Sequence, residues 1–221
     1  MRGWQTAAIL GLVSVALGAC QSLPSDQAGN IAISQSMLPE ASAMPSGQPE
    51  SDPPPGFVSF CLRFQDQCQS NPSEAAVVIL TDKVWAELRS VNSKTNADIW
   101  PADDQAHYGR PEYWTIPTDG YGDCDDYAVT KRQRLARLGL PLKALRVAVV
   151  MTPRNNRHAV LTVATDRGDF VLDNQTDEIV AWNQTGYRWL ARQDDRNDWG
   201  WVALGTTAPT AVATAESKTV R

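Results

Sequence analysis

Three residues of this chain have the types and the order that covalent catalysis by a thiol requires. Cys124 stands in the stretch GDCDDYA, His158 in RHAVLTV and Asp173 in DFVLDN. A nucleophilic cysteine needs a base that takes its proton and a third group that orients the base. The gaps along the chain are 158 − 124 = 34 and 173 − 158 = 15 residues. We therefore predict a triad in which Cys124 is the nucleophile, His158 is the base and Asp173 fixes the tautomer of the imidazole.

The residue types alone leave a second interpretation open. A cysteine, a histidine and an aspartate occur in most chains of this size, and a buried thiol with a surface histidine and a turn aspartate would need no chemistry. The chain has only two histidines, so His107 is the other candidate base. With two histidines, a zinc site built from several of them is excluded.

A helix that begins at Cys124 would position the thiol. In CDDYAVTKRQRLARLGLP the apolar residues recur at helical spacing, acidic residues fill the first turn, and Gly139 and Pro141 end the pattern. Cys124 therefore lies at a helix N-terminus, where the dipole lowers the pKa of a thiol. Its backbone N–H is also a natural donor to the oxyanion of acyl transfer. An earlier helix is predicted over residues 81–99, capped by Thr81.

The period of the apolar residues changes after the Cys124 helix. LRVAVVM, HAVLTVAT and FVLDN are typical of β-strands, and TPRNNR and DRGD supply the turns between them. We expect an α+β fold in which Cys124, at the helix N-terminus, packs against an antiparallel sheet that carries His158 and Asp173. Tyr113 and Trp114, in the loop before the helix, either line the cleft or pack beneath that loop.

At these residues the sequence resembles the bacterial transglutaminase-like cysteine proteinases. The matching stretches are YGRPEYWTIPTDGYGDCDDYAVTKRQRLARLGLP, LRVAVV, RHAVLTV and DFVLDN, and the resemblance extends from about Val91 to Asn183. It implies a papain-like or transglutaminase-like core with Cys124, His158 and Asp173 as its triad. The best-known members are periplasmic proteases that release large adhesins from the cell surface, so a surface adhesin is an expected substrate.

The aspartates around Cys124 bear on its reactivity. A carboxylate about 6 Å from a thiolate raises the thiol pKa by about two units at an effective dielectric near 20, so Asp123, Asp125 and Asp126 work against a thiolate. A bound Ca²⁺ would reverse the local charge, and the resemblance implies that Asp123 and Asp125 correspond to calcium-binding acids of the family. We expect a calcium site at Asp123 and Asp125, with Asp126 as a further ligand. The alternative is that Asp125 and Asp126 only complement the helix dipole.

The first residues, MRGWQTAAILGLVSVALGAC, have the basic start, short apolar run and small residues of a secretory signal. The closing LGAC resembles the lipobox of bacterial lipoproteins, with Cys20 as the acylated residue. We therefore expect a signal peptide over residues 1–19, export to the periplasm and a lipid anchor at Cys20. Gln21 slightly favours the outer membrane. Simple signal-peptidase cleavage and an uncleaved anchor are the alternatives.

Export would place the remaining cysteines in an oxidising compartment. Cys61 and Cys68 lie close together in FCLRFQDQCQ, and we expect them to form a disulfide. Cys124 is then the one thiol left. The alternative is that Cys61 and Cys68 are free buried thiols.

The composition divides the chain into a folded unit and two arms. Residues 20–56 are rich in Pro, Ser, Gln, Ala and Gly and have no aromatic residue, so we expect a disordered tether. Residues 206–221 are similarly simple and are expected to form a disordered tail. The predicted domain is residues 57–205.

The net charge and the motif content limit the classes of function that the chain can have. The net charge of −5 argues against nucleic-acid binding, and no P-loop or dinucleotide fingerprint indicates an organic cofactor. We expect an exported cysteine peptidase that cleaves a protein of the cell envelope through an acyl-enzyme, with calcium as its one cofactor. The alternatives are an amidase or transglutaminase that uses the same triad, and a catalytically inert binding module.

Overall fold

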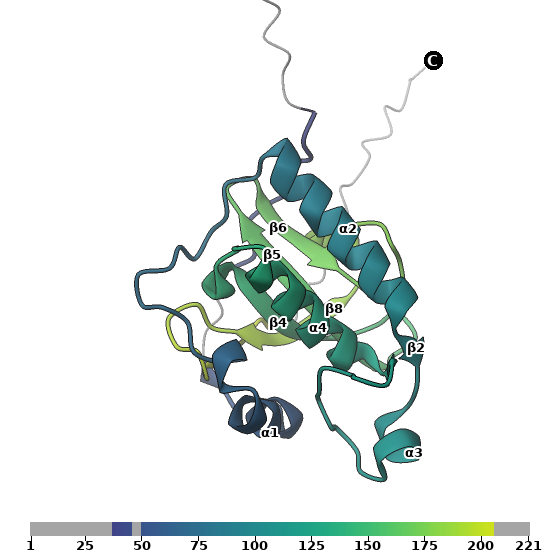
Figure 1. The fold of residues 1–221 in the computed structure, drawn as a ribbon. Coiled ribbons are helices and arrows are strands. Elements are labelled where there is room, and N and C mark those ends of the chain that lie inside the picture. The colour runs from purple at the N-terminus through teal and green to yellow at the C-terminus, as the bar shows by residue number, and fades with distance from the viewer. Residues whose placement is uncertain (1–36, 46–49, 206–221) are drawn as a thin grey trace, which may run out of the picture. The chain divides into compact units, whose positions relative to one another are not determined.

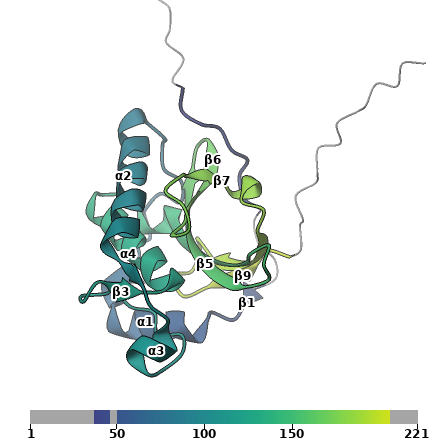
Figure 2. The same cartoon turned by 90° about the vertical axis from the view of Figure 1, so that its right-hand side faces the viewer.

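The computed structural model describes residues 37–45 and 50–205. Their largest element is a seven-stranded sheet in which all neighbouring strands are antiparallel. Figure 2 shows that this sheet is strongly curved. Its strands, in the order in which they lie side by side, are β1 (Glu50–Ser51), β9 (Trp201–Ala203), β8 (Arg188–Gln193), β4 (Leu145–Met151), β5 (Arg157–Thr165), β6 (Gly168–Leu172) and β7 (Val180–Ala181).

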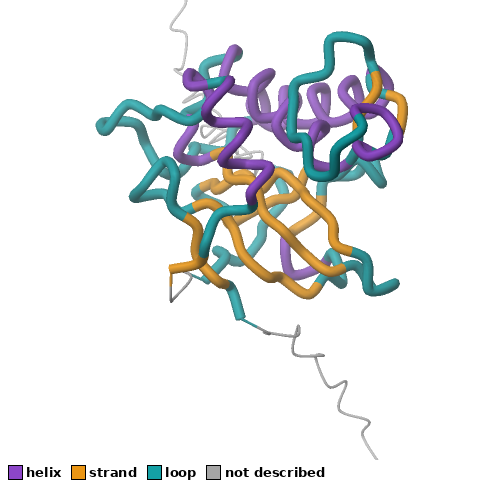
Figure 3. The backbone as a smooth tube through the Cα atoms, turned by 90° about the horizontal axis from the view of Figure 1, so that it is seen from below, coloured by secondary structure: helices purple, strands orange, loops and turns teal. Residues whose placement is uncertain are grey.

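The helices gather on one side of the sheet, as Figures 1 and 3 show. α4 packs against β5 of the sheet and against α2. A short parallel pair, β2 and β3, precedes α4. This mixture of helices with an antiparallel sheet confirms the predicted α+β fold class. The elements on the helical side are α1 (Pro55–Arg63), α2 (Asp82–Asp98), β2 (Trp100–Pro101), α3 (Asp104–Tyr108), β3 (Tyr121–Gly122) and α4 (Cys124–Arg137). The 3-10 helices of the described residues are η1 (Gln65–Gln67), η2 (Leu142–Ala144) and η3 (Trp182–Gln184).

Helix α4 begins and ends where the sequence predicts. Its C-terminus closes through a bond from the Gly139 N–H to the Ala136 carbonyl and one from the Leu140 N–H to the Leu135 carbonyl. These are the two bonds of a Schellman motif, which needs a residue in the left-handed region, and Gly139 has φ of 93°. The last turn is therefore fixed by backbone chemistry that the glycine in LGLP provides.

The main core lies between α4, α2 and the sheet. Leu135 of α4 and Leu88 of α2 are fully buried against Val147 of β4, Leu161 of β5 and Leu172 of β6. Each such side chain stabilises the fold by about 1.5–3 kcal/mol. Because these contacts join the helix to three strands, the N-terminus of α4 is fixed relative to the start of β5.

The hairpin of β5 and β6 brings two distant residues of the sequence together. Its register pairs Leu161 with Leu172 and Thr165 with Gly168. His158, near the start of β5, and Asp173, just after β6, therefore lie at the same end of the hairpin. Gly168 has φ of 102°, and a Cβ there would lie 2.3 Å from the Ala41 carbonyl oxygen, so the tight turn at the other end requires glycine.

We predicted a disordered tether over residues 20–56, but its last part forms hydrogen bonds with the fold. Ala41 donates its N–H to the Arg167 carbonyl, and Asp169 donates its N–H to the Ser42 carbonyl. Met44 donates its N–H to Asp169 Oδ2 at 2.7 Å, and its side chain is buried on the far face of the sheet. Composition could not reveal this contact, because its acceptors belong to a hairpin more than a hundred residues away.

Ordered structure continues through residues 50–56, where β1 and the first turn of α1 precede the predicted start of the domain. The predicted signal peptide, Cys20, Gln21 and the tail over residues 206–221 lie outside the described residues. Within the described residues, no helix is both long and apolar enough to span a membrane.

Cys61 and Cys68 form the disulfide that the sequence predicts. Both residues are buried in the main core, beside Phe57 and Phe60 of α1. The bond joins α1 to the residue that follows η1, so it closes the short segment between them.

Replacing both Cys61 and Cys68 with alanine should lower the free energy of unfolding by about 2–3 kcal/mol, because closing a loop this short restricts the unfolded chain by about that amount. Equilibrium unfolding in urea, followed by tryptophan fluorescence, measures the change. Reduction of the unaltered protein should give the same loss. An unfolding midpoint that does not move would show that the bond does not stabilise the fold.

Candidate active site

The first turn of α4 is held by Asp126. Its Oδ1 accepts the backbone N–H of Thr115 at 2.6 Å, and its Oδ2 accepts the backbone N–H of Asp123 at 3.3 Å. A Cβ at Gly122 would lie 2.5 Å from Asp126 Oδ2. The glycine of GDCDDYA is therefore required for the chain to pass close enough to this carboxylate, which fixes Cys124 as the first residue of α4.

The sulfur of Cys124 lies near Ala159 of β5, close enough for the backbone N–H groups of Ala159 and Asp125 to lower the pKa of the thiol. Burial raises the pKa of the Cys124 thiol, the charges of Asp125 and Asp123 raise it further, and the two N–H groups oppose them. Burial and the aspartates thus outweigh the lowering of the thiol pKa that we expected from the helix N-terminus. The increase that the aspartates cause is the one that the sequence predicts.

His158 and Asp173 are in direct contact. His158 Nε2 lies 2.8 Å from Asp173 Oδ1, and both side chains are buried. Burial alone would raise the pKa of Asp173, but hydrogen bonds from His158, from the Tyr187 hydroxyl and from the Gln175 N–H outweigh it and lower that pKa. A carboxylate that stays ionised accepts from Nε2–H, which leaves Nδ1 of His158 free to take a proton.

The structure therefore brings two of the three predicted triad residues into contact and places the third beside their strand. Ala159, whose N–H lowers the pKa of the Cys124 thiol, directly follows His158 in β5. His107 does not take part: it lies in α3, where its Nε2 pairs with Asp119 at 2.8 Å. His158, and not His107, is therefore the histidine that pairs with Asp173.

Two residues that hold Asp173 and the chain that follows it were not found from the sequence. Asn96 of α2 donates its side-chain amide to the backbone carbonyl of Asp173 at 3.0 Å, and Asn92 donates to the carbonyls of Thr176 and Asp177, each at 3.1 Å. Asn92 and Asn96 stand four residues apart, so they share one face of the helix. That spacing was a usable signal, but nothing in the sequence indicates what the face contacts.

A cluster of carboxylates surrounds the start of α4. Oxygens of Asp104, Asp123 and Asp126 lie within 4.8 Å of one another, and Asp123, Cys124 and Asp125 form a second such group. One buried oxygen each of Asp104, Asp123 and Asp125 has no hydrogen-bond partner among the described residues. Asp123 belongs to both groups, and carboxylate oxygens this close together are the donors that a calcium ion takes.

The acids of this cluster are buried and close together, and both effects raise their pKa values. Burial, followed by repulsion from neighbouring acids, raises the pKa of Asp126 to about 8 and that of Asp125 well above its ordinary value. The pKa values of Asp123 and Asp104 are also raised, first by burial. Asp104, in α3, is the member that the sequence did not reveal, because no periodicity connects α3 with the start of α4.

Tyr113 and Trp114, the aromatic residues in the loop before α4, contact other side chains of the fold. Trp114 is buried in the core, edge-on to Phe57 at 5.9 Å and to Trp201 at 6.3 Å. It therefore packs beneath the loop and does not line a cleft. The ring of Tyr113 lies between the guanidinium groups of Arg63 and Arg110, at 4.1 and 4.6 Å.

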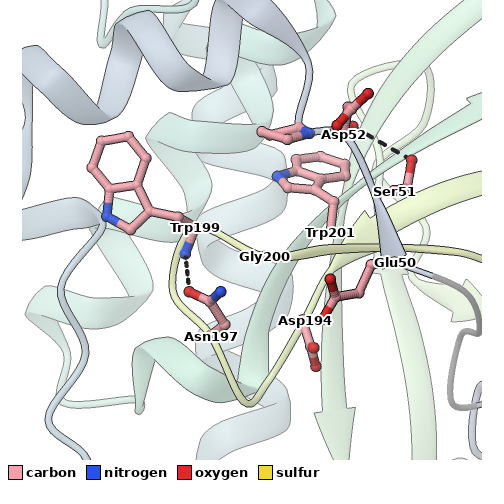
Figure 4. Close-up of a pocket in the computed structure, with 9 residues that line it drawn as sticks. Glu50, Ser51, Asp52, Asp194, Asn197, Trp199, Gly200 and Trp201 are labelled. Carbon is pink, nitrogen blue, oxygen red and sulfur yellow. Dashed lines mark hydrogen bonds between the residues drawn. The ribbon is translucent and has the colours of Figure 1, made fainter.

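A separate hollow of about 340 Å³ lies beside β1 and β9, as Figure 4 shows. Trp199 and Trp201 line it together with Glu50 and Asp194. None of the predicted catalytic or metal-binding residues borders it, so it is distinct from the site at the start of α4.

Comparison with known proteins gives a matching family and similar solved structures. A sequence model of the family described as bacterial transglutaminase-like cysteine proteinase (BTLCP) matches residues 48–208. Calcium-bound LapG of Legionella pneumophila is 23% identical, with a TM-score of 0.48, over 58% of this chain and 74% of that chain. LapG of the same organism treated with EGTA is 24% identical, with a TM-score of 0.46, over 54% of this chain and 67% of that chain. No curated protein matches the chain.

In the absence of divalent cations, the free energy of unfolding should fall as the pH rises from about 5 to 7. Asp125 and Asp126 keep their protons in the fold but lose them in the unfolded chain, where the Asp pKa is about 3.9, so each makes unfolding more favourable by up to about 1.4 kcal/mol per pH unit. Urea unfolding in EDTA measures this slope.

The matched control for this slope is Asp126→Asn, which should flatten it by about one proton because the amide does not titrate. Its side-chain oxygen can still accept the Thr115 N–H. A metal-free protein whose stability is constant or rises across this range would contradict the raised pKa values of the cluster.

Proposed function

This chain belongs to the bacterial transglutaminase-like cysteine proteinases and is a cysteine peptidase, and from that premise we propose that it cleaves a protein substrate through Cys124, His158 and Asp173. One observation carries the assignment. Asp173 binds Nε2 of His158, and the backbone N–H of the next residue, Ala159, lies close enough to the Cys124 sulfur to lower the pKa of the thiol. This supports a triad in which the free Nδ1 of His158 faces the thiol.

The reaction that these groups support is acyl transfer to the sulfur. Nδ1 of His158 takes the proton of Cys124, and the sulfur attacks the carbonyl carbon of the scissile peptide bond. The imidazolium then gives its proton to the leaving amine, and a thioester remains on Cys124. A water molecule, deprotonated by His158, attacks the thioester and releases the carboxylic acid with the restored thiol. Throughout, Asp173 holds the ring and stabilises its positive charge.

The negative charge that develops on the carbonyl oxygen needs donors. The backbone N–H of Cys124 is among the first four of α4, which have no acceptor within the helix. It therefore lies beside the sulfur with its donor free, where a tetrahedral oxyanion would form. We assign it as one donor of the oxyanion hole.

The carboxylates at the start of α4 fit a calcium ion. Asp104, Asp123 and Asp125 each have a buried oxygen without a partner among the described residues, and hard oxygens are the ligands that calcium prefers. We propose that these three residues hold the ion. Asp126 contributes less to it, because both of its oxygens already accept backbone N–H groups. A bound cation would supply positive charge beside the sulfur and so favour its thiolate.

We further propose that the enzyme acts in the periplasm, anchored through a lipid on Cys20, on a protein of the cell envelope such as a surface adhesin. The support is the LGAC stretch that ends the signal-like segment and the disulfide of Cys61 and Cys68, which suits an oxidising compartment.

The purified protein, with calcium, should cut a large surface protein of the same cell into discrete fragments that Cys124→Ala does not produce. His158→Ala should lower kcat/KM by about 100-fold or more, because it removes the general base. His107→Ala is the matched control, since His107 pairs with Asp119 and not with Asp173, and it should retain most of the original activity. Fragments that persist with Cys124→Ala would contradict a thiol peptidase and favour a binding module.

Removing calcium with EGTA should slow cleavage by at least about tenfold, because each unit by which the thiol pKa rises costs a factor of ten in thiolate. Isothermal titration should show Ca²⁺ binding that is lost in Asp123→Asn and Asp125→Asn. Asp52→Asn, which changes an exposed carboxylate far from α4 in the sequence, should bind as before. Absence of binding heat together with activity that EGTA does not change would remove calcium from the mechanism.

A further inference from the structure

The two oxygens of Asp173 are held in different ways. Oδ1 lies 2.8 Å from His158 Nε2 and also accepts the Gln175 N–H at 3.0 Å. Oδ2 accepts the hydroxyl of Tyr187 at 2.6 Å. Tyr187 directly precedes β8, so it reaches the carboxylate from a strand that is not next to β6 in the sheet. No other hydrogen bond to Oδ2 occurs among the described residues, so Tyr187 alone fixes this half of the carboxylate.

The ring of Tyr187 also contacts the base itself. It lies edge-on to the imidazole of His158, with the ring centroids 5.8 Å apart and the planes at 74°. The tyrosine thus touches both members of the His158–Asp173 pair. Its hydroxyl is committed to Asp173 as a donor, because burial and the hydrogen bond to this carboxylate raise the pKa of Tyr187.

A buried basic residue of α4 is influenced by the charge of Asp173. Lys131 is fully buried, and its ammonium has no hydrogen-bond acceptor among the described residues. Its burial lowers the pKa of Lys131 to about 7, against the opposing charges of Asp173 and Asp177. A carboxylate held by one oxygen can rotate about its Cβ–Cγ bond, and the unsatisfied ammonium would favour rotation away from His158.

We propose that Tyr187 is a positioning residue for the peptidase: its hydroxyl locks the Asp173 carboxylate in the orientation that presents Oδ1 to His158 Nε2, and so keeps Nδ1 as the nitrogen that serves Cys124. This inference rests on the proposed function, since it assigns to the same triad a fourth side chain that touches neither substrate nor sulfur. Without the hydroxyl, the carboxylate turns toward Lys131 and the imidazole loses the acceptor that selects its tautomer.

The variant Tyr187→Phe keeps the ring and removes the hydroxyl. In the unaltered protein, ¹⁵N spectra of the histidine ring should show the Nε2–H tautomer for His158, and the variant should show a mixture of both tautomers. With two histidines in the chain, His107→Ala assigns the signals. Turnover should fall about tenfold with an unchanged KM, because a hydrogen bond to a charged group that does not touch substrate is lost.

The matched control is Tyr127→Phe. Tyr127 is buried in α4 and donates its hydroxyl to the Ile99 carbonyl, so this variant also loses one buried tyrosine hydrogen bond but leaves Asp173 untouched. It should lose stability with no change in the His158 tautomer. A Tyr187→Phe protein that retains the Nε2–H tautomer and a kcat within about twofold of the original would overturn the proposal.

A second variant tests the contribution of Lys131. Adding Lys131→Met to Tyr187→Phe removes the buried ammonium, and the Nε2–H tautomer should return. If the mixture persists, Asp173 does not turn toward Lys131, and that step is wrong. The spectra do not depend on cleavage, so they test Tyr187 even if the unaltered protein and Cys124→Ala are equally inactive, a result that would count against the proposed peptidase alone.

Discussion

The contact between the first turn of α4 and the start of β5 is the constraint on which the candidate site depends. The helix is joined to the sheet by fully buried leucine and valine side chains, and its N-terminus is fixed by the two oxygens of Asp126. The Cys124 thiol therefore lies near the backbone N–H of Ala159, which directly follows His158 in β5. Because Cys124 belongs to a helix and His158 to a strand, the proposed proton transfer would need no loop movement.

The same turn makes the site electrostatically unfavourable on its own. The carboxylates that shape it raise the thiol pKa, and they hold protons themselves because they are buried and close together. A divalent cation would relieve both effects at once, since it replaces the protons on the acids and adds positive charge near the sulfur. Stability and reactivity would thereby both depend on one ion, which would explain why acids can surround a nucleophilic thiol.

The sequence predicts the parts of the site that follow from local pattern. The period and the end signals of CDDYAVTKRQRLARLGLP give α4 and the place of Cys124, and two strands joined by the DRGD turn bring His158 and Asp173 to one end of a hairpin. The disulfide follows from the spacing of Cys61 and Cys68. These features need only neighbours in the chain or in one hairpin.

The parts that the sequence did not reveal come from distant segments. Tyr187, Asn96 and Asp104 reach the site from β8, α2 and α3, and their partners are set by how these elements pack. The sequence did not reveal the contact of Met44 with Asp169 for the same reason. A segment without aromatic residues does not indicate that it binds along a distant hairpin. Tertiary packing, and not local propensity, decides such contacts.

The most direct test of the central claim is the rate at which iodoacetamide alkylates Cys124, measured by peptide mapping in calcium at about pH 7, in the unaltered protein and in His158→Ala. If His158 takes the proton of the thiol, Cys124 should react readily and the substitution should slow the reaction by about tenfold or more. Equal rates in the two proteins would show that the imidazole does not act on the sulfur, and the proposed triad would be wrong.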